Sequence, residues 1–457
     1  MKPHPRIPAQ AILAFLRRVE KADVLLHGFE LRFAGEVQAE GYYAPFCKGE
    51  MHRMYSVSKS MVSLAIGILE AEGRLCLDDP VVRYFPEKVT AATDGRLLRL
   101  TIRDMLRMAT CYVKTTYDPA ADADWTAAFF TAAPSHEPGT VFSYDTSSTQ
   151  VLGALCQRLS GEALLSFLTC RVFAPIGADD PKAWLTDPAG NAQGGTGLLL
   201  SLRDLGKTAQ LLLDGGRGIV PADYLRRATM KQIGTPFQPV PEERLGYGYQ
   251  FWRGRDGYML YGMGGQLALI CPAKKLILCT IGDTQLDPLG MQSIYDAFYE
   301  TLVPAAPVTD EPQADRAALS QALSGLRVRP LPHCEAFAVP FASRYRMADG
   351  TGDLREVWFT GEEVRLVWAD GVHTYAYRLG GVCDGTLPHW NTRCLTFAGF
   401  GEDGVLRLRC HQIESAPCGL ELLFSKRADA LTVQMRSSGD LSLRRYQGFF
   451  WGEAAPE

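Results

Sequence analysis

Residues 55–60 read YSVSKS, and the chain after them stays small and apolar as far as Gly73. This pattern predicts a helix that the glycine stops. Positions i and i+3 share one face of a helix, so Ser56 and Lys59 would lie within hydrogen-bond range of each other. A serine hydroxyl becomes a good nucleophile when a base takes its proton, and a lysine is such a base when burial and nearby positive charge lower its pKa. Ser58 has no lysine three residues later, so the pattern favours Ser56 as nucleophile and Lys59 as base.

A second motif reads YDT at residues 144–146, and an apolar helical segment follows it over 151–159. Together the two segments resemble the S-x-x-K and Y-x-N elements of the serine β-lactamase and penicillin-binding-protein superfamily, especially its class C branch with its esterases and amidases. Further matches follow in family order between residues 24 and 302: LTIRDML at 100–106, GGTGL at 194–198, SLRDL at 201–205 and GYGYQFW at 246–252.

The resemblance implies roles for the residues of this second motif. Tyr144 would share proton transfer with Lys59 as a second general base, with its phenol held partly ionised by the nearby ammonium group. Thr146 stands where the family usually has an asparagine that binds substrate, and its hydroxyl could still donate one hydrogen bond there. We also expect the acidic Asp145 to attract an amine if the substrate carries one. His52 and Arg53, just before the nucleophile, are predicted to form a surface cap, and the alternative is that they reach the pocket.

The third motif of the family is K-T-G on an edge strand, where a backbone N–H completes the oxyanion hole and the lysine holds a substrate carboxylate. The KTA at residues 207–209 falls inside a predicted helix, so the better match is GMGGQ at residues 262–266. Glycines such as Gly264 let an acyl group lie against the backbone. The N–H of either Gly265 or Gln266 would then join that of the nucleophile around the oxyanion, and the sequence leaves both registers open.

Neither lysine nor histidine stands in this motif where the family places its carboxylate-binding cation. The sequence therefore predicts a serine hydrolase that forms an acyl-enzyme with a small, uncharged ester or amide. One alternative is a β-lactamase or D,D-peptidase. A second alternative is a binding protein that kept the fold without the activity.

The organisation of the chain predicts an α+β hydrolase domain over residues 1–305. Alternating apolar residues over 24–43 indicate a β-hairpin, and strand patterns return over 246–281 before a helical pattern at 289–302. A helical middle between strands at both ends implies that the first and last thirds share one antiparallel sheet. This arrangement agrees with the β-lactamase/transpeptidase-like fold that the resemblance implies.

The composition changes to proline, alanine, aspartate and glutamine over residues 306–335, which indicates a linker. Short alternating stretches separated by turn signals then recur over 336–457 and predict an antiparallel sheet or barrel. This part resembles, more loosely, the lipocalin-like β domain appended to some members of the superfamily, most clearly at 396–400 and 405–424.

Composition excludes several classes of function. Lysine and arginine number 47 against 51 aspartates and glutamates, a formal net charge of −4 without long runs of one sign. Nucleic-acid binding needs a concentrated basic face, so we expect no nucleic-acid partner. Apolar stretches such as 61–69 fall short of the roughly 20 residues that span a bilayer, so we expect no membrane partner. Charges interrupt the N-terminal apolar patch at 11–16 and no cleavage site follows, which predicts a cytoplasmic protein.

The twelve cysteines lie far apart without a C-x-x-C pair, and the eight histidines show no H-x-x-x-H spacing. We therefore expect buried reduced thiols, with no metal site and no cofactor. The expected partner is the small ester or amide substrate, and the sequence leaves the oligomeric state open.

Overall fold

The computed structural model describes residues 4–337, 344–348, 352–388, 391–414, 416–439 and 444–455. The chain divides into two compact units. The first consists of Met1–Tyr43, Cys47–Gly282 and Leu289–Leu326, and the second of Ala44–Phe46, Asp283–Pro288 and Arg327–Glu457.

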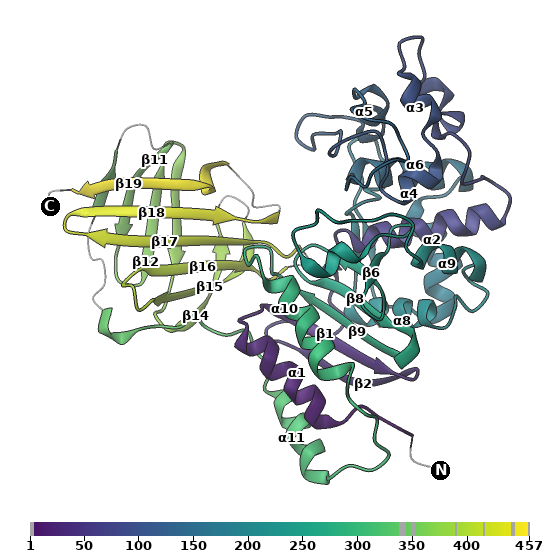
Figure 1. Ribbon diagram of the computed structural model, residues 1–457. Coiled ribbons are helices and arrows are strands. Elements are labelled where there is room, and N and C mark those ends of the chain that lie inside the picture. The colour runs from purple at the N-terminus through teal and green to yellow at the C-terminus, as the bar shows by residue number, and fades with distance from the viewer. Residues whose placement is uncertain are drawn as a thin grey trace. The chain divides into compact units, whose positions relative to one another are not determined.

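A six-stranded antiparallel sheet lies at the centre of the first unit (Figure 1). Its strands are β1 (Leu26–Phe33), β2 (Glu36–Tyr42), β6 (Trp252–Gly254), β7 (Gly257–Gly262), β8 (Gln266–Cys271) and β9 (Leu276–Gly282), in the order β2-β1-β9-β8-β7-β6. The predicted hairpin β1–β2 is confirmed, and β1 pairs with β9, with Phe29 opposite Thr280. Strands from the two ends of the unit thus share one sheet, as the α+β prediction requires.

Helices cover both faces of this sheet (Figure 1). One face packs on α1 (Ala9–Lys21) and α10 (Gly290–Ala297), and the other on α2 (Val57–Ala71) and α8 (Leu202–Leu213), with α6 (Thr146–Ser160) packed against α2. Successive side chains of a strand point to opposite faces, so Leu267 and Leu269 of β8 join the first core whereas Ala268 and Ile270 join the second. Burial on both faces explains why β8 is apolar at every position after Gln266.

The helical middle of the unit contains the smaller elements around α2 and α6. These are α3 (Gly95–Arg99), α4 (Ile102–Leu106), α5 (Trp125–Thr131), α7 (Leu164–Leu168) and α9 (Ala222–Thr229). A separate small sheet has the order β3 (His52–Arg53), β5 (Leu198–Leu200), β4 (Ala183–Trp184). The Met54 N–H donates to the Leu198 carbonyl at 2.7 Å, so this sheet holds the approach to α2 beside the approach to α8.

The strand patterns expected from residue 246 onward give a strand only from Trp252, because Gln250 has a left-handed backbone with φ of 66°. Its side-chain amide and its main-chain carbonyl together bond three helices. The side-chain NH₂ donates to the Leu106 carbonyl at 2.8 Å, and the side-chain oxygen accepts from Thr149 at 2.8 Å. Its main-chain carbonyl accepts from Ser60 at 2.7 Å. Gln250 therefore joins α2, α4 and α6, and these contacts replace strand pairing.

The linker predicted over 306–335 differs in the structure, since residues within it form helix α11 (Gln313–Ser324) of the first unit. Alanine, leucine and glutamine favour a helix, and Pro312 precedes its first turn. Gln10 of α1 donates to Asp315 at 2.9 Å, and Leu319 is buried in the same core as α1. The chain passes to the second unit after Leu326.

The second unit is an antiparallel sheet of ten strands (Figure 1). They are β10 (Arg344–Met347), β11 (Leu354–Phe359), β12 (Glu363–Trp368), β13 (Gly371–Ala376), β14 (Gly381–Leu387), β15 (Thr392–Phe400), β16 (Leu406–Gln412), β17 (Gly419–Arg427), β18 (Ala430–Ser437) and β19 (Gly448–Ala454). The order is β13-β12-β11-β10-β19-β18-β17-β16-β15-β14, and the edge strands β13 and β14 approach each other. Burial alternates along β12 and β18. The predicted antiparallel sheet is therefore a nearly closed barrel.

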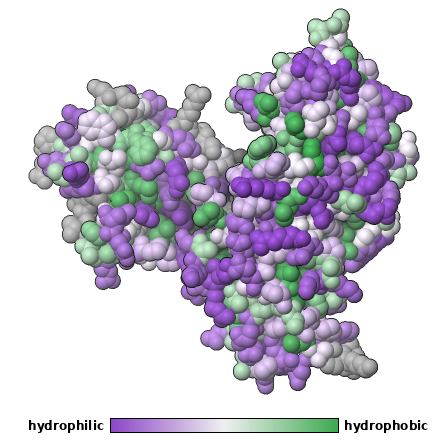
Figure 2. Space-filling model, viewed as in Figure 1, coloured by the Kyte–Doolittle hydropathy of each residue, from purple (hydrophilic) through white to green (hydrophobic). Residues whose placement is uncertain are grey.

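Within the described ranges, no single helix is long and apolar enough to cross a bilayer; α6 and the segment Leu164–Ile176 reach that length and hydropathy only as a pair, bent by 73°. The same ranges contain no group of three or more histidine, cysteine or acidic side chains that could hold a metal ion. The face of the first unit seen in Figure 2 is mainly hydrophilic, with small hydrophobic patches between charged residues.

Candidate active site

The candidate nucleophile lies at a sharp turn between β3 and α2. Tyr55 has φ of 44° and is only 3% exposed, so the surrounding packing holds a strained backbone directly before Ser56. Ser56 occupies the N-cap position of α2, where a serine commonly accepts a hydrogen bond from the first turn. Its side chain makes no such cap bond. The hydroxyl is thereby left to interact with side chains of the site.

Lys59 lies one helical turn below this hydroxyl, as the i, i+3 spacing predicts. Its Nζ is 3.1 Å from the Ser56 Oγ and donates to the Gly195 carbonyl at 2.8 Å. The side chain is 1% exposed, and burial lowers the pKa of Lys59 to about 7, against the opposing effect of the charge on Asp145. Near neutral pH the amine is therefore uncharged for a large part of the time and can accept the proton of Ser56.

Tyr144 completes the group around Ser56. Its phenol lies next to the Ser56 side chain, and the Lys59 Nζ lies 5.1 Å from its ring centroid. The ring stacks on Trp252 at 5.8 Å and meets Tyr247 edge to face at 6.4 Å. Burial raises the pKa of Tyr144 well above its ordinary value, although the neighbouring Ser56 side chain opposes this. The expectation of a partly ionised phenol is wrong, because the environment favours the neutral form.

Asp145 has a structural role. Its carboxylate accepts from the Ser147 N–H at 2.9 Å, from the Ser147 hydroxyl and from Thr110 at 3.3 Å, and so caps the first turn of α6. The side chain is buried, and burial raises the pKa of Asp145 to about 6. The expectation that this carboxylate attracts a substrate amine is wrong, because it is buried and already bonded within the protein.

Gly195 is a residue of the site whose role the sequence did not show. A Cβ added there would lie 2.4 Å from the Thr146 Cγ2 and 3.1 Å from the Lys59 Nζ. Only glycine therefore lets the backbone turn come close enough to accept the hydrogen bond from Lys59. The Thr146 side chain thus lies beside this turn. The main-chain N–H of Thr146 donates to the Thr115 hydroxyl at 3.2 Å. The GGTGL match located the turn but carried no sign of its contact with the lysine.

His52 and Arg53 do not form the predicted surface cap. His52 is 2% exposed and its Nε2 lies 2.9 Å from the Nδ1 of His27. Arg53 is half-buried, donates to the Thr196 carbonyl at 3.2 Å and lies over the Tyr55 ring at 5.0 Å. Both residues therefore support the approach to Ser56 from inside the protein.

The hairpin between β7 and β8 contains the candidate third motif. A Cβ added at Gly262 would meet the Met54 carbonyl at 2.3 Å, which places the end of β7 against the chain just before Ser56. Gly264 and Gly265 follow with φ of 84° and 99°, a conformation that favours glycine. The turn expected from GMGGQ is therefore present next to the strained approach to the nucleophile.

The Gln266 side chain fixes this hairpin from within. Its NH₂ group donates to the carbonyls of Met263 at 2.6 Å and Gly282 at 3.1 Å, and its oxygen accepts from the Gly282 N–H at 3.0 Å. The Thr280 hydroxyl bonds the Gly265 carbonyl at 2.7 Å. Gln266 is fully buried, so only its backbone could take part in an oxyanion hole. The choice between the N–H of Gly265 and that of Gln266 stays a prediction.

Similarity to known proteins agrees with this geometry. A family model described as Beta-lactamase matches residues 32–285, which is more than half of the chain. The chain belongs to the β-lactamase family. This β-lactamase-family protein is 29% identical over 198 residues to the 6-aminohexanoate-dimer hydrolase of Paenarthrobacter ureafaciens, a match covering 40% of this chain and 50% of that relative. It is 29% identical over 154 residues to esterase EstB of Burkholderia gladioli, covering 30% of this chain and 39% of the relative.

The matches to this chain thus cover half or less of the length of these two curated relatives. Among solved structures, a penicillin-binding-protein homologue from Caulobacter crescentus has a TM-score of 0.52 and 19% identity, covering 66% of this chain and 100% of that chain. SurE with D-Leu has a TM-score of 0.52 and 17% identity, covering 94% of this chain and 98% of that chain. At these identities the structures show the fold, and the predicted β-lactamase-like fold is confirmed.

Proposed function

We propose that this protein is a serine hydrolase that cleaves a small, uncharged ester or amide through an acyl-enzyme on Ser56. The observation that carries the proposal is the 3.1 Å contact between the Ser56 Oγ and the buried Lys59 Nζ, whose pKa lies near 7. A base with a pKa near the working pH is both available in its uncharged form and strong enough to accept a proton.

In the acylation step, the uncharged Lys59 takes the Ser56 proton while Oγ forms a bond to the substrate carbonyl carbon. The backbone N–H of Ser56, with that of Gly265 or Gln266, stabilises the negative charge on the carbonyl oxygen. The neutral Tyr144 phenol donates its proton to the leaving oxygen or nitrogen as that bond breaks, and the Lys59 ammonium returns a proton to Tyr144. These transfers leave an ester on Ser56 and release the first product.

Deacylation repeats these transfers with water in place of the serine. The Tyr144 phenol passes its proton to the uncharged Lys59 as it takes one from the attacking water, the Ser56–acyl bond breaks, and a proton returns along the same path to the Ser56 Oγ. The aromatic stack of Tyr144 on Trp252 keeps the phenol in position through both half-reactions.

The substrate class rests on two observations. Met263 stands at the tip of the third-motif hairpin where the family has its cation, and its side chain is 40% exposed. Without that cation, a substrate carboxylate would lose a charge-assisted contact worth about 1.5–3 kcal/mol. The names of the two relatives, a 6-aminohexanoate-dimer hydrolase and an esterase, support hydrolysis of an amide or ester bond and do not bear on the charge of the substrate. A cytoplasmic location and the absence of nucleic-acid and membrane partners stay predictions.

A panel of paired p-nitrophenyl esters, each with and without a free carboxylate on the acyl group, tests this proposal. We expect larger kcat/KM values for the uncharged series, and a preference for the carboxylate series or turnover of a cephalosporin would return the β-lactamase alternative to first place. Ser56→Ala should abolish turnover. Ser58→Ala is the matched control, because the Ser58 hydroxyl accepts from the Leu198 N–H at 3.0 Å and takes no part in the reaction.

A further inference from the structure

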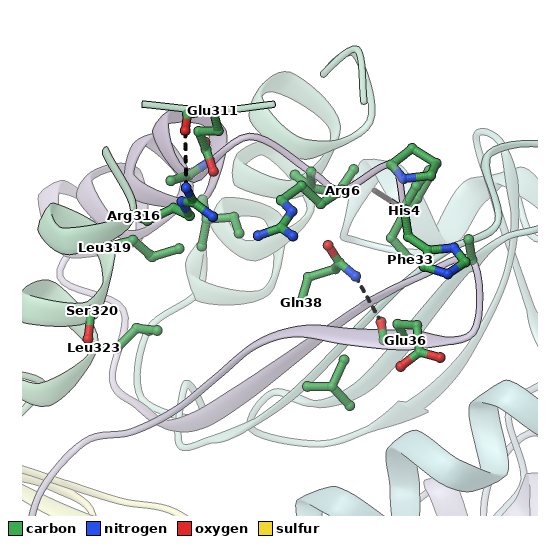
Figure 3. A pocket seen from close by; sticks show the side chains of 16 residues that line it. His4, Arg6, Phe33, Glu36, Gln38, Glu311, Arg316, Leu319, Ser320 and Leu323 are labelled. Atoms are coloured by element: carbon green, nitrogen blue, oxygen red, sulfur yellow. Dashed lines mark hydrogen bonds between the residues drawn. The ribbon is translucent and has the colours of Figure 1, made fainter. Parts of the chain in front are cut away.

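A hollow of about 690 Å³ lies in the first unit, away from the candidate active site, between α1, α11 and the turn of the β1–β2 hairpin (Figure 3). It is lined by His4, Pro5, Arg6, Ile7, Ala9, Ile12, Phe33, Ala34, Glu36, Val37, Gln38, Glu311, Arg316, Leu319, Ser320 and Leu323. None of the residues assigned to the candidate active site belongs to this set. The hollow is therefore a separate candidate binding site.

One part of the hollow is apolar. Ile12 of α1 is buried, and Leu319 and Leu323 face it from α11. Phe33 and Val37 contribute from the hairpin, and Val37 is 44% exposed. Exposed aliphatic and aromatic surface in a concave site gains free energy when an apolar group covers it. This part of the hollow fits an alkyl chain.

Another part of the hollow carries two positive charges. The Arg6 and Arg316 guanidinium groups point into the same space (Figure 3). Among the described residues, no carboxylate forms an ion pair with either of them, and Arg316 donates only to the Glu311 main-chain carbonyl, at 3.4 Å. The Glu311 carboxylate instead accepts from the Ala9 N–H at 2.5 Å, at the start of α1. Figure 3 shows the Glu36 carboxylate turned away from the two arginines.

We propose that this hollow binds a monoanionic amphiphile, a medium-chain fatty carboxylate. Guanidinium groups bind carboxylates through paired, charge-assisted hydrogen bonds, so Arg6 and Arg316 would hold the head group. The alkyl chain would then lie over Leu319, Leu323 and Val37. A volume within the usual range of small-molecule sites accommodates a ligand of this size. This site is separate from the proposed hydrolase activity and does not depend on it.

Titration of the full-length protein with sodium decanoate, followed by calorimetry and by hydrogen exchange, tests the proposal. We expect saturable binding with one ligand per chain and new protection of amides confined to α1, α11 and the β1–β2 hairpin. Acetate, which lacks the chain, and decyltrimethylammonium, which carries the opposite charge, should bind at least tenfold more weakly. Arg6→Gln and Arg316→Gln should each weaken decanoate binding about tenfold.

Arg17→Gln is the matched control, because Arg17 is an exposed arginine of α1 outside the hollow and its loss should leave binding unchanged. The proposal is overturned if decanoate does not bind, if protection appears elsewhere, or if decyltrimethylammonium binds as tightly. It is also overturned if both arginine variants, folded by circular dichroism, bind decanoate like the wild type.

Discussion

Replacing Lys59 by methionine should abolish activity and change the stability of the fold in a direction that depends on pH. The pKa of Lys59 falls from 10.5 to about 7 in the folded protein. Each tenfold change in proton affinity is worth about 1.4 kcal/mol, so the charged lysine costs the folded state about 5 kcal/mol below pH 7. Between pH 7 and 10.5 the unfolded chain binds the extra proton, so this cost disappears as pH rises.

Methionine removes that cost but also the hydrogen bond to the Gly195 carbonyl, whose loss is worth about 1–3 kcal/mol. Lys59→Met should therefore be more stable than the wild type by about 2–4 kcal/mol at pH 6, and less stable by about 1–3 kcal/mol at pH 10.5. Urea unfolding at both pH values measures the difference. Lys114→Met, at an exposed lysine, is the matched control and should show little dependence on pH. A stability difference for Lys59→Met that does not change between these pH values would refute the buried, uncharged base.

Four further outcomes are expected. Gly195→Ala should lower kcat at least a hundredfold with little unfolding, because the added Cβ would reach Thr146 and the Lys59 Nζ. Gly234→Ala is the control, since the nearest atom to a Cβ there is 3.9 Å away. Equal kcat values in the two variants would contradict the contact between Gly195 and Lys59. Tyr144→Phe keeps the aromatic stack but loses the phenol, so kcat should fall at least a hundredfold while the urea midpoint stays within error. Gln250→Leu should lower the free energy of unfolding by about 2–4 kcal/mol, since it breaks the bonds to α4 and α6, and an unchanged midpoint would refute that role. Below pH 7, kcat/KM should fall about tenfold per pH unit as Lys59 becomes protonated, and a flat profile from pH 5 to 8 would contradict the role of its lowered pKa.

Local spacing was enough to predict the contact between Ser56 and Lys59, because residues i and i+3 lie on the same face of any regular helix. Alternation was likewise enough for the β1–β2 hairpin and for the sheet of the second unit. Each of these features depends on neighbours in the chain, or on a period that the residues themselves display.

Features that depend on distant contacts could not be predicted. Gly195 reads as an ordinary turn glycine until Lys59 and Thr146, far away in the sequence, are placed beside it. Gln250 sits in a run with strand propensity, but its side-chain amide bonds α4 and α6 and its main-chain carbonyl accepts from Ser60 of α2. Composition also gave an incomplete prediction over 306–335. The prolines there suggested a linker, whereas part of the segment forms α11, which is stabilised by packing on α1.

The assignment of Ser56 as nucleophile is tested by the mass of the protein after reaction with a fluorophosphonate, with the modified residue located by peptide mapping. We expect one adduct per chain, on Ser56, formed more slowly below pH 7 and absent from Ser56→Ala. Labelling of a different residue, or ester turnover that persists in Ser56→Ala, would contradict it.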